Sequence, residues 1–341
     1  MEDARPRSHR GRGRPQLPHP PTARVAAGRS RPMTTRREFL ETTAAVVASQ
    51  WVGPLRVPGR MPLGFSTLGC PRWDWRQVLD FAAGHDFAAV ELRGLQTQMD
   101  LTQVPEFAPA RLAEAKRQLA EHGLVVSCLG SSANMHDMDA AKHAAQLDDA
   151  RRFIDLAQAL GAPYVRVFGN KYVAGVSREA MLAHIARGLH ELGEYARGKG
   201  VAVLIESHGD FTDSPALLEI LQQADSPGAA LLWDAHHTFV SGKEAPEDTV
   251  RQVGRYIRHT HLKDSVRVGN DRRYVLTGTG EVPVRRQVEA LARTGYSGYF
   301  SFEWEKRWHP EIDEPEVAIA QFATVASGYL RDAGVRDVPA R

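Results

Sequence analysis

Residues 201–208 read Val-Ala-Val-Leu-Ile-Glu-Ser-His and form an apolar, β-branched run that ends in ionisable residues. A continuous apolar run of this length is typical of a parallel strand buried on both faces. A helical pattern over residues 178–199 precedes it, and Gly200 stands where a helix-ending glycine belongs. This stretch therefore predicts a helix that leads into a buried parallel strand, with polar side chains at the strand's carboxyl end.

The same alternation of short apolar runs and longer helical patterns repeats from residue 62 onward. Further helical patterns cover residues 108–122 and 147–160, and Gly123, Gly161 and Gly295 again precede strands. The eight expected strands are residues 63–68, 88–93, 125–131, 164–168, 202–207, 230–235, 257–263 and 299–305. Eight βα units in roughly 270 residues predict a single (β/α)8 TIM barrel over residues 61–335. An open doubly wound sheet is the rival, but no Gly-x-Gly-x-x-Gly follows an early strand.

Composition is that of a globular protein, with 43% hydrophobic and 25% charged residues. No stretch approaches the roughly 18 uncharged apolar residues of a spanning helix, so the sequence predicts no membrane span. The net charge of +2 conceals an asymmetry, because residues 1–60 contain 12 Arg and 4 acids and the remainder carries −6. An acidic body argues against a nucleic-acid partner. Cys70 and Cys128 are too few for a disulfide framework or a cysteine zinc site and read as small apolar residues.

Residues 1–60 are expected to be a leader outside the fold, with residues 1–32 disordered because they are rich in Arg, Pro and Gly and lack apolar periodicity. Residues 35–40, Thr-Arg-Arg-Glu-Phe-Leu, precede a modest apolar run over residues 42–52 and resemble a twin-arginine export signal. Met33, just before this motif, is an alternative start to Met1. The expected location is the periplasm; an ordinary basic tail would leave the protein cytoplasmic.

Ionisable residues gather at the ends of the last four expected strands. With a side-chain period of two, Glu206 and His208 share the inward face of residues 202–207, and His259, His261 and Lys263 share one face of residues 257–263. Glu303 and Glu305 do so on residues 299–305, and Asp234 ends residues 230–235. Several carboxylates and an imidazole in one barrel mouth need a compensating charge, and a divalent cation is the simplest. A strand-end Glu taken alone is more often a salt-bridged residue than a ligand, but four in order are hard to obtain by chance.

The four motifs carry a family resemblance. Ile-Glu-Ser-His around Glu206, Asp-Ala-His-His from Asp234, His-Thr-His-Leu-Lys-Asp around His261 and Ser-Phe-Glu-Trp-Glu around Glu303 resemble the sugar isomerase/epimerase family with its xylose-isomerase-like barrel. Residues 276–281, Leu-Thr-Gly-Thr-Gly-Glu, resemble the Gly-x-Gly segment after the family's seventh strand. The similarity covers about residues 62–330. It implies that these four residues are the metal ligands and that the two glutamates, Glu206 and Glu303, are the catalytic acid/base pair.

An oxygen-rich ligand set with one histidine suits Mn²⁺ best, with Mg²⁺, Co²⁺ or Zn²⁺ as alternatives. A carboxylate on each side of a sugar carbon can remove and return a proton beside a carbonyl, and a cation can stabilise the resulting enediolate. The expected function is therefore a metal-dependent sugar isomerase or epimerase. A lyase or dehydratase acting on an inosose or 3-keto-sugar is the alternative, and a non-catalytic sugar-binding barrel is a third.

Three residues are candidates for substrate binding. His237, three residues after Asp234, is favoured over His236, and His208 lies two residues beyond Glu206 on the same face. Lys263 could polarise a carbonyl or pair with Glu305. Glu305 could also replace Glu303 as ligand.

Other inward or mouth residues have weaker claims. Arg93 and Arg166 could hold a carboxylate or phosphate, but structural Arg–Glu pairs, for instance with Glu91, are the preferred interpretation. Trp73 and Trp308 stand in or beside expected mouth loops, where they could stack on a sugar, whereas Trp75 is expected to pack on the first helix.

An apurinic endonuclease, a related alternative, needs further ligands that this sequence lacks. Its Asp-x-His corresponds here to Asp-Arg-Arg at residues 271–273, and residues 131–134, Ser-Ser-Ala-Asn, supply no His. The expected partner is a small carbohydrate, and a homo-oligomer is compatible with the sequence.

Overall fold

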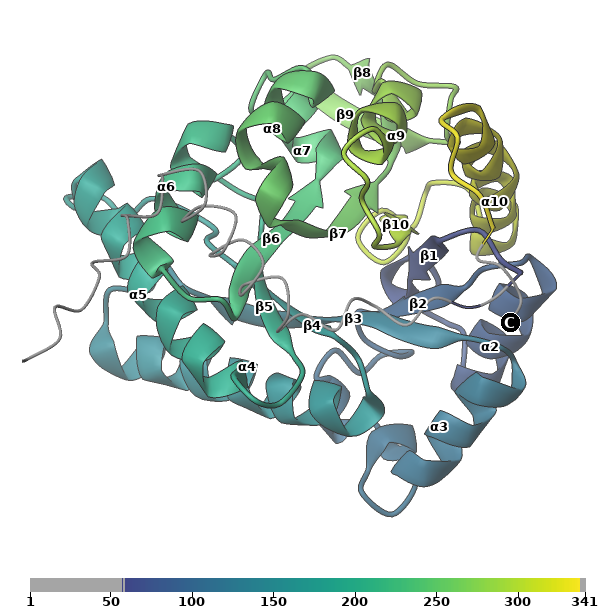
Figure 1. The fold of residues 1–341 in the computed structure, drawn as a ribbon, viewed down its shortest axis with the longest axis horizontal. Coiled ribbons are helices and arrows are strands. Elements are labelled where there is room, and N and C mark those ends of the chain that lie inside the picture. Colours follow the sequence, from purple (N-terminus) through teal and green to yellow (C-terminus); the bar gives the residue numbers. More distant parts are fainter. Residues whose placement is uncertain (1–56, 58, 338–341) are drawn as a thin grey trace, which may run out of the picture. The chain divides into compact units, whose positions relative to one another are not determined.

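Eight parallel strands close into a barrel in the computed structural model, which describes residue 57 and residues 59–337 (Figure 1). The strands are β1 (Leu63–Ser66), β2 (Ala89–Leu92), β3 (Val125–Asn134), β4 (Tyr164–Phe168), β5 (Ala202–Glu206), β6 (Ala229–Asp234), β7 (Ile257–Leu262) and β10 (Phe300–Phe302). Each strand pairs with its sequence neighbours, and β1 closes the ring by pairing with β10. The predicted TIM barrel is confirmed. The expected export signal lies outside the described residues.

Helices follow the strands and surround the barrel (Figure 1). They are α2 (Trp75–Gly84), α3 (Leu112–Glu121), α4 (Ala140–Leu160), α5 (Arg178–Ala196), α6 (Ser214–Ala224), α7 (Ala235–Val240), α8 (Pro246–Val253), α9 (Val284–Ala292) and α10 (Pro315–Asp332). Short 3₁₀ turns lie at Thr67–Gly69, Leu101–Gln103, Pro105–Phe107 and Gly254–Tyr256. In the part of the chain that the structure describes, no helix combines the length and apolarity needed to cross a bilayer.

Local sequence explains where the helices begin and end. Asp74, Asp139, Ser177 and Asp213 each precede a helix, and each side chain accepts a backbone N–H from three residues further on. Such caps satisfy N–H groups that have no partner inside the helix. Gly161 ends α4 at φ +80°, a conformation that glycine adopts without a steric penalty.

The two faces of the strands build two cores. The barrel interior contains a small apolar cluster of Cys128, Tyr164, Ala202, Leu204, Ala230 and Leu232. The opposite face, with Val203 and Ile205 on β5, belongs to the larger core that packs against the helices. Leu204 lies in the inner cluster, and the inward position predicted for Glu206, two residues further on, is therefore confirmed, because side chains alternate along a strand.

Three details differ from the sequence prediction. Helix α4 begins at Ala140, seven residues before the apolar pattern, because Asp139 caps it. Strand β10 ends at Phe302, so Glu303 and Glu305 follow the strand, where the Trp304 indole donates to the Asp313 carbonyl at 2.9 Å. An antiparallel hairpin outside the barrel sheet, β8 (Asp264–Val268) and β9 (Asp271–Val275), was not predicted.

Candidate metal centre

Four side chains converge at the carboxyl ends of β5, β6, β7 and β10. They are Glu206, Asp234, His261 and Glu303, and one potential ligand atom from each lies within 4.8 Å of all the others. Their exposed fractions are 2%, 0%, 0% and 5%. The four residues predicted as ligands thus share one buried space at the end of the barrel where this fold places its chemistry.

Register and one hydroxyl hold this arrangement together. Asp234 of β6 pairs with His261 of β7, and Ser301 of β10 pairs with His261 from the other side. The Ser207 hydroxyl donates to the Asp234 carbonyl at 3.1 Å and accepts the Asp234 backbone N–H at 2.8 Å. The ends of β5 and β6 are therefore fixed beside each other before any side chain of the cluster is considered.

The His261 ring is oriented by Glu91 of β2. His261 Nε2 lies 2.9 Å from Glu91 Oε2, and His259 Nε2 lies 2.7 Å from the same oxygen. On its other side, His261 Nδ1 faces Glu206 Oε1 at 3.4 Å and Glu303 Oε1 at 3.2 Å. A carboxylate behind a metal-binding histidine commonly fixes its tautomer. Glu91 thus directs the Nδ1 lone pair of a neutral His261 toward the carboxylates.

This role of Glu91 differs from the expected structural Arg–Glu pair, because Glu91 pairs with two histidines of β7. The available signal was parity, since Glu91, His259 and His261 all occupy inward positions.

Lys263 neutralises part of the charge. Its ammonium lies 2.5 Å from Asp234 Oδ2 and 3.0 Å from Glu305 Oε1, and it also contacts Glu303. Burial lowers the pKa of Lys263, but Asp234, Glu303 and Glu305 outweigh it and hold the pKa well above its usual value. Lys263 is therefore a buried cation, and the Glu305 salt bridge considered from the sequence is present.

The carboxylates of the cluster are kept in different states. Burial raises the pKa of Glu206, but Arg166 and His261 lower it to about 2. For Glu303, burial again raises the pKa, and His261 and Lys263 bring it well below its ordinary value. For Glu305 the effect of burial is the larger one. Burial raises its pKa to about 7, although the charge of Lys263 acts to lower it.

Formal charge shows that the cluster fits a divalent cation. Four carboxylates meet here: Glu206, Asp234, Glu303 and Glu305. The cations in contact with them are Lys263 and Arg166, whose Nε lies 3.2 Å from Glu206 Oε2. With His261 neutral and Glu305 ionised, two negative charges remain uncompensated, and buried excess charge is costly. His261 Nδ1 and Glu206 Oε2 also have no hydrogen-bond partner among the described residues. Three carboxylates and one imidazole suit Mn²⁺, Mg²⁺, Co²⁺ or Zn²⁺, and the alternative ligand Glu305 is outside the four-atom cluster.

The candidate substrate residues lie beside this cluster. The rings of His208 and His237 are 5.1 Å apart, and His237 Nε2 is 3.4 Å from Asp234 Oδ2. The neighbouring His236 instead contacts the Ser265 hydroxyl at 2.7 Å and is 3% exposed. This geometry is compatible with the choice of His237 over His236. Substrate contacts by His208, His237 and Lys263 remain predictions.

One carboxylate organises the Gly-x-Gly segment after β7. Asp264 accepts the backbone N–H groups of Gly278 and Gly280 at 2.9 Å and of Val282 at 3.1 Å. A Cβ at position 280 would lie 2.1 Å from Asp264 Oδ1, so only glycine fits there. Asp264 therefore fixes the loop that leads into α9.

The remaining sequence candidates are mostly structural. Trp75, expected to pack on the first helix, is instead the first residue of that helix and packs edge-on against Phe107; Trp73 is buried as well, whereas Trp308 is 55% exposed. Both cysteines are buried, and burial raises the pKa of each thiol.

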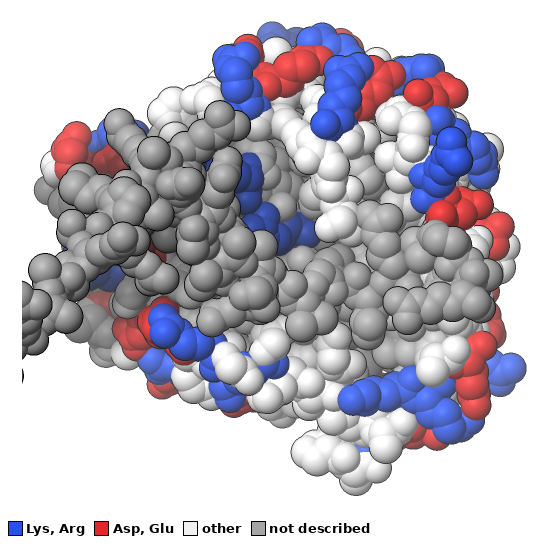
Figure 2. Space-filling model, viewed as in Figure 1, with Lys and Arg blue, Asp and Glu red and all other residues white. Residues whose placement is uncertain are grey.

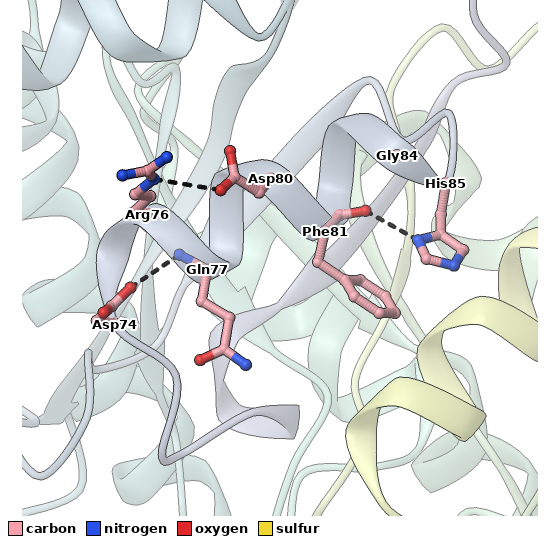
Figure 3. Close-up of a pocket in the computed structure, with 7 residues that line it drawn as sticks. All are labelled: Asp74, Arg76, Gln77, Asp80, Phe81, Gly84 and His85. Atoms are coloured by element: carbon pink, nitrogen blue, oxygen red, sulfur yellow. Dashed lines mark hydrogen bonds and ion pairs between the residues drawn. The ribbon is translucent and has the colours of Figure 1, made fainter.

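Two surface features lie outside the cluster. Exposed basic and acidic side chains are mixed in sign over the described part of the face in Figure 2. A shallow hollow on α2 is lined by Asp74, Arg76, Gln77, Asp80, Phe81, Gly84 and His85 (Figure 3). In it Arg76 pairs with Asp80 and Asp74 caps the helix, so these polar groups serve α2 itself.

Comparison with known proteins places the chain in a family. It is 27% identical over 162 residues to an inosose dehydratase of Geobacillus thermodenitrificans, covering 42% of this chain and 52% of that protein. The chain thus spans about half the length of the curated inosose dehydratases that it matches. The structure resembles IOLI protein with a bound zinc atom (TM-score 0.67, 17% identity, 80% and 98% coverage). It also resembles D-psicose 3-epimerase from Clostridium cellulolyticum (TM-score 0.63, 18% identity, 78% and 98% coverage). The family described as xylose isomerase-like TIM barrel matches residues 79–324, and the chain belongs to that family.

Proposed function

We propose that this protein is a divalent-metal-dependent sugar isomerase or epimerase that moves a proton at a carbon beside a carbonyl. The observation that carries the proposal is the buried convergence of Glu206, Asp234, His261 and Glu303, one potential ligand atom of each lying within 4.8 Å of all the others. Membership of the xylose isomerase-like family supports a carbohydrate substrate.

Glu206, Asp234, Glu303 and the Nδ1 of His261 would hold the metal. When bound, a divalent ion would supply positive charge beside substrate oxygens that become negative during proton transfer. Mn²⁺ is the proposed ion because the donors are mostly oxygen. The zinc atom in the IOLI structure supports Zn²⁺ as an alternative.

The two glutamates are the proposed acid/base pair. Strands β6 and β7 separate β5 from β10, so Glu206 and Glu303 approach the cluster from different sides. Glu206, held ionised by Arg166 and His261, can accept a proton from carbon. Glu303, held ionised by His261 and Lys263 in the metal-free protein, would be the second carboxylate of the pair. His208 and His237 would bind substrate hydroxyl groups.

A dehydratase acting on an inosose is the second candidate. The observation that favours it is that the first curated relatives are inosose dehydratases, matched at 26–28% identity over part of their length. The same first proton transfer serves both reactions, and loss of a β-hydroxyl afterwards would give elimination.

The test is deuterium exchange. The full chain is stripped of metal, reloaded with Mn²⁺ and incubated in D₂O with ketoses, inososes and 3-keto-glycosides, and the sugars are analysed by mass spectrometry. Metal-dependent deuterium uptake without mass loss supports the isomerase or epimerase. Uptake with loss of water supports the dehydratase.

Glu206→Gln and Glu303→Gln should each reduce the exchange by about 10²–10⁴-fold, the usual contribution of general acid–base catalysis. Glu289→Gln on α9, outside the cluster, is the matched control. Metal binding without exchange on any of these sugars would favour the sugar-binding barrel, and absence of metal binding would refute the ligand assignment.

We further propose export through the twin-arginine motif at Arg36 and Arg37. A reporter fused behind residues 33–60 should reach the periplasm, and replacing both arginines with lysine should retain it in the cytoplasm. A reporter that stays in the cytoplasm with the intact motif would argue for a basic tail.

A further inference from the structure

Two arginine side chains enter the barrel mouth beside Glu206. Arg166 lies in β4 and is 1% exposed, and Arg93 follows β2 and is 8% exposed. They are close enough that the charge of Arg166, after burial, lowers the pKa of Arg93 to about 9. Two buried guanidinium groups that repel each other require a reason to be there.

Both arginine side chains pack over one glycine. A Cβ at Gly130 of β3 would lie 2.6 Å from Arg93 Cδ and 2.8 Å from Arg166 Nη2. The Arg166 guanidinium is also stacked over Phe168, 3.8 Å from the ring centroid. Because Gly130 has no side chain, the side chains of Arg93 and Arg166 can both occupy the space above it. Stacking on Phe168 keeps Arg166 in that position.

Several N–H groups of Arg93 and Arg166 have no hydrogen-bond acceptor among the described residues. Arg93 Nη2 donates to the Ser132 hydroxyl at 3.0 Å, but Arg93 Nη1 has no acceptor, and no carboxylate among the described residues forms an ion pair with Arg93. Arg166 Nε is 3.2 Å from Glu206 Oε2, yet its N–H is not directed at that oxygen, and Arg166 Nη1 also lacks an acceptor. A buried donor without a partner destabilises the protein, and more so when it is charged.

We propose that Arg93 and Arg166 form a subsite for an oxyanion substituent of the substrate, a carboxylate or a phosphate, next to the metal centre. This inference rests on the proposed function and narrows its substrate to acidic or phosphorylated sugars and cyclic ketones. Guanidinium groups offer donors only, in a planar fork that matches a carboxylate or phosphate. An oxyanion between them supplies acceptors to the unused N–H groups and reduces the repulsion between the two cations.

Binding of small oxyanions tests the subsite without catalysis. The metal-stripped full chain is titrated calorimetrically with inorganic phosphate and with acetate at constant ionic strength set by chloride. Saturable binding of at least one probe is expected. Preference for phosphate would indicate a phosphorylated substrate, and preference for acetate an acidic sugar.

Variants assign the binding to the arginines. Arg93→Met should weaken the preferred probe at least tenfold, since hydrogen bonds to charged groups contribute about 1.5–3 kcal/mol each. Gly130→Ala keeps both charges but displaces both side chains, and should weaken it as well. Arg273→Met, which removes an exposed arginine of the β8–β9 hairpin, should change nothing. Circular dichroism identifies a variant that fails to fold, in which case Arg93→Lys replaces Arg93→Met.

No saturable binding of either probe, or equal binding by wild type, Arg93→Met and Gly130→Ala, would overturn the subsite. The deuterium exchange experiment, with sugar phosphates and sugar acids added to its panel, separates this failure from failure of the proposed function. Exchange confined to neutral sugars and unaffected by Arg93→Met leaves the function and refutes the subsite. Arginine-dependent phosphate or acetate binding without exchange on any sugar leaves the subsite and refutes the function.

Discussion

Replacing Lys263 with Met should destabilise the metal-free protein strongly and the metal-loaded protein much less. The Lys263 ammonium is fully buried and contacts Asp234, Glu303 and Glu305. Met fills a similar volume but carries no charge, so three carboxylates would face one another without this cation. A bound divalent ion would supply the missing positive charge to Asp234 and Glu303, which are two of its expected ligands.

The size of the effect follows from these contacts. Removing one partner of a buried ion pair costs about 3–5 kcal/mol. Each kcal/mol lowers the melting temperature of a folded unit of this size by about 2–4 °C, so the metal-free Lys263→Met protein should melt about 6–20 °C below wild type. Glu305, whose pKa burial already raises to about 7, can take up a proton at lower pH and relieve part of the repulsion. The loss should therefore be larger at pH 8 than at pH 6.

Thermal melts of wild type and Lys263→Met, each with chelator and with Mn²⁺, measure this difference. The double variant Lys263→Met/Glu305→Gln is the matched control, because it removes one of the three carboxylates and should recover part of the lost stability. Equal melting temperatures with chelator, or a larger loss with Mn²⁺ than without it, would refute the charge balance described for the cluster.

Three further results are expected. Burial lowers the pKa of His261, but Glu303, Glu91 and Glu206 raise it well above its usual value, so a metal ion must displace a proton from His261. The affinity for Mn²⁺ should therefore rise about tenfold per pH unit around neutrality. An affinity that does not change with pH, measured by competition with a chelator, would contradict this. Glu91→Gln should weaken Mn²⁺ binding about 10–100-fold while Mn²⁺ still binds, as measured by electron paramagnetic resonance, because its carboxylate orients His261; unchanged affinity would exclude the orienting role. Asp264→Ala should lower the free energy of unfolding by about 3 kcal/mol, since it leaves the buried N–H of Val282 and the part-buried N–H groups of Gly278 and Gly280 without an acceptor. Denaturant melts should show almost no loss for Glu281→Gln, an exposed neighbour, and an equal loss in both variants would contradict the argument.

Periodicity was sufficient to predict the barrel and the ionisable residues that face inward at its strand ends, whereas the choice of four of them as one cluster followed from the family resemblance. Alternation along a strand distinguishes Val203 from Glu206, and the carboxyl ends of parallel strands must meet at one end of a closed barrel. The sequence placed strand ends within a few residues, since each apolar run ends where ionisable residues begin. Side-chain alternation and the end of an apolar run each depend on residues that are close together in the sequence. A single sequence is therefore enough to recognise them.

Contacts between distant strands could not be predicted in the same way. Glu91 meets His259 across 168 residues, and the choice of a histidine partner over Arg93 depends on the stagger of β2 against β7. From the sequence, Arg93 and Arg166 could not be distinguished. In the structure Arg166 is paired with Glu206, whereas Arg93 has no carboxylate partner among the described residues. Side-chain reach in three dimensions decides such pairings, and parity gives only the face.

The β8–β9 hairpin has a consequence for how this scaffold can diversify. Its two strands pair with each other and with no strand of the closed barrel. Asp264 at its base accepts the Gly280 N–H from the loop before α9, and Arg272 donates to the Ser265 carbonyl on the neighbouring strand. Tyr274 on its second strand contacts His236 and His309. Insertions in the outer turn of the hairpin would therefore change the surface beside this end of the barrel without altering strand register or the positions of Glu206, Asp234, His261 and Glu303. Under the proposed function, evolution or a designer could alter substrate selectivity here while leaving the proton-transfer groups in place.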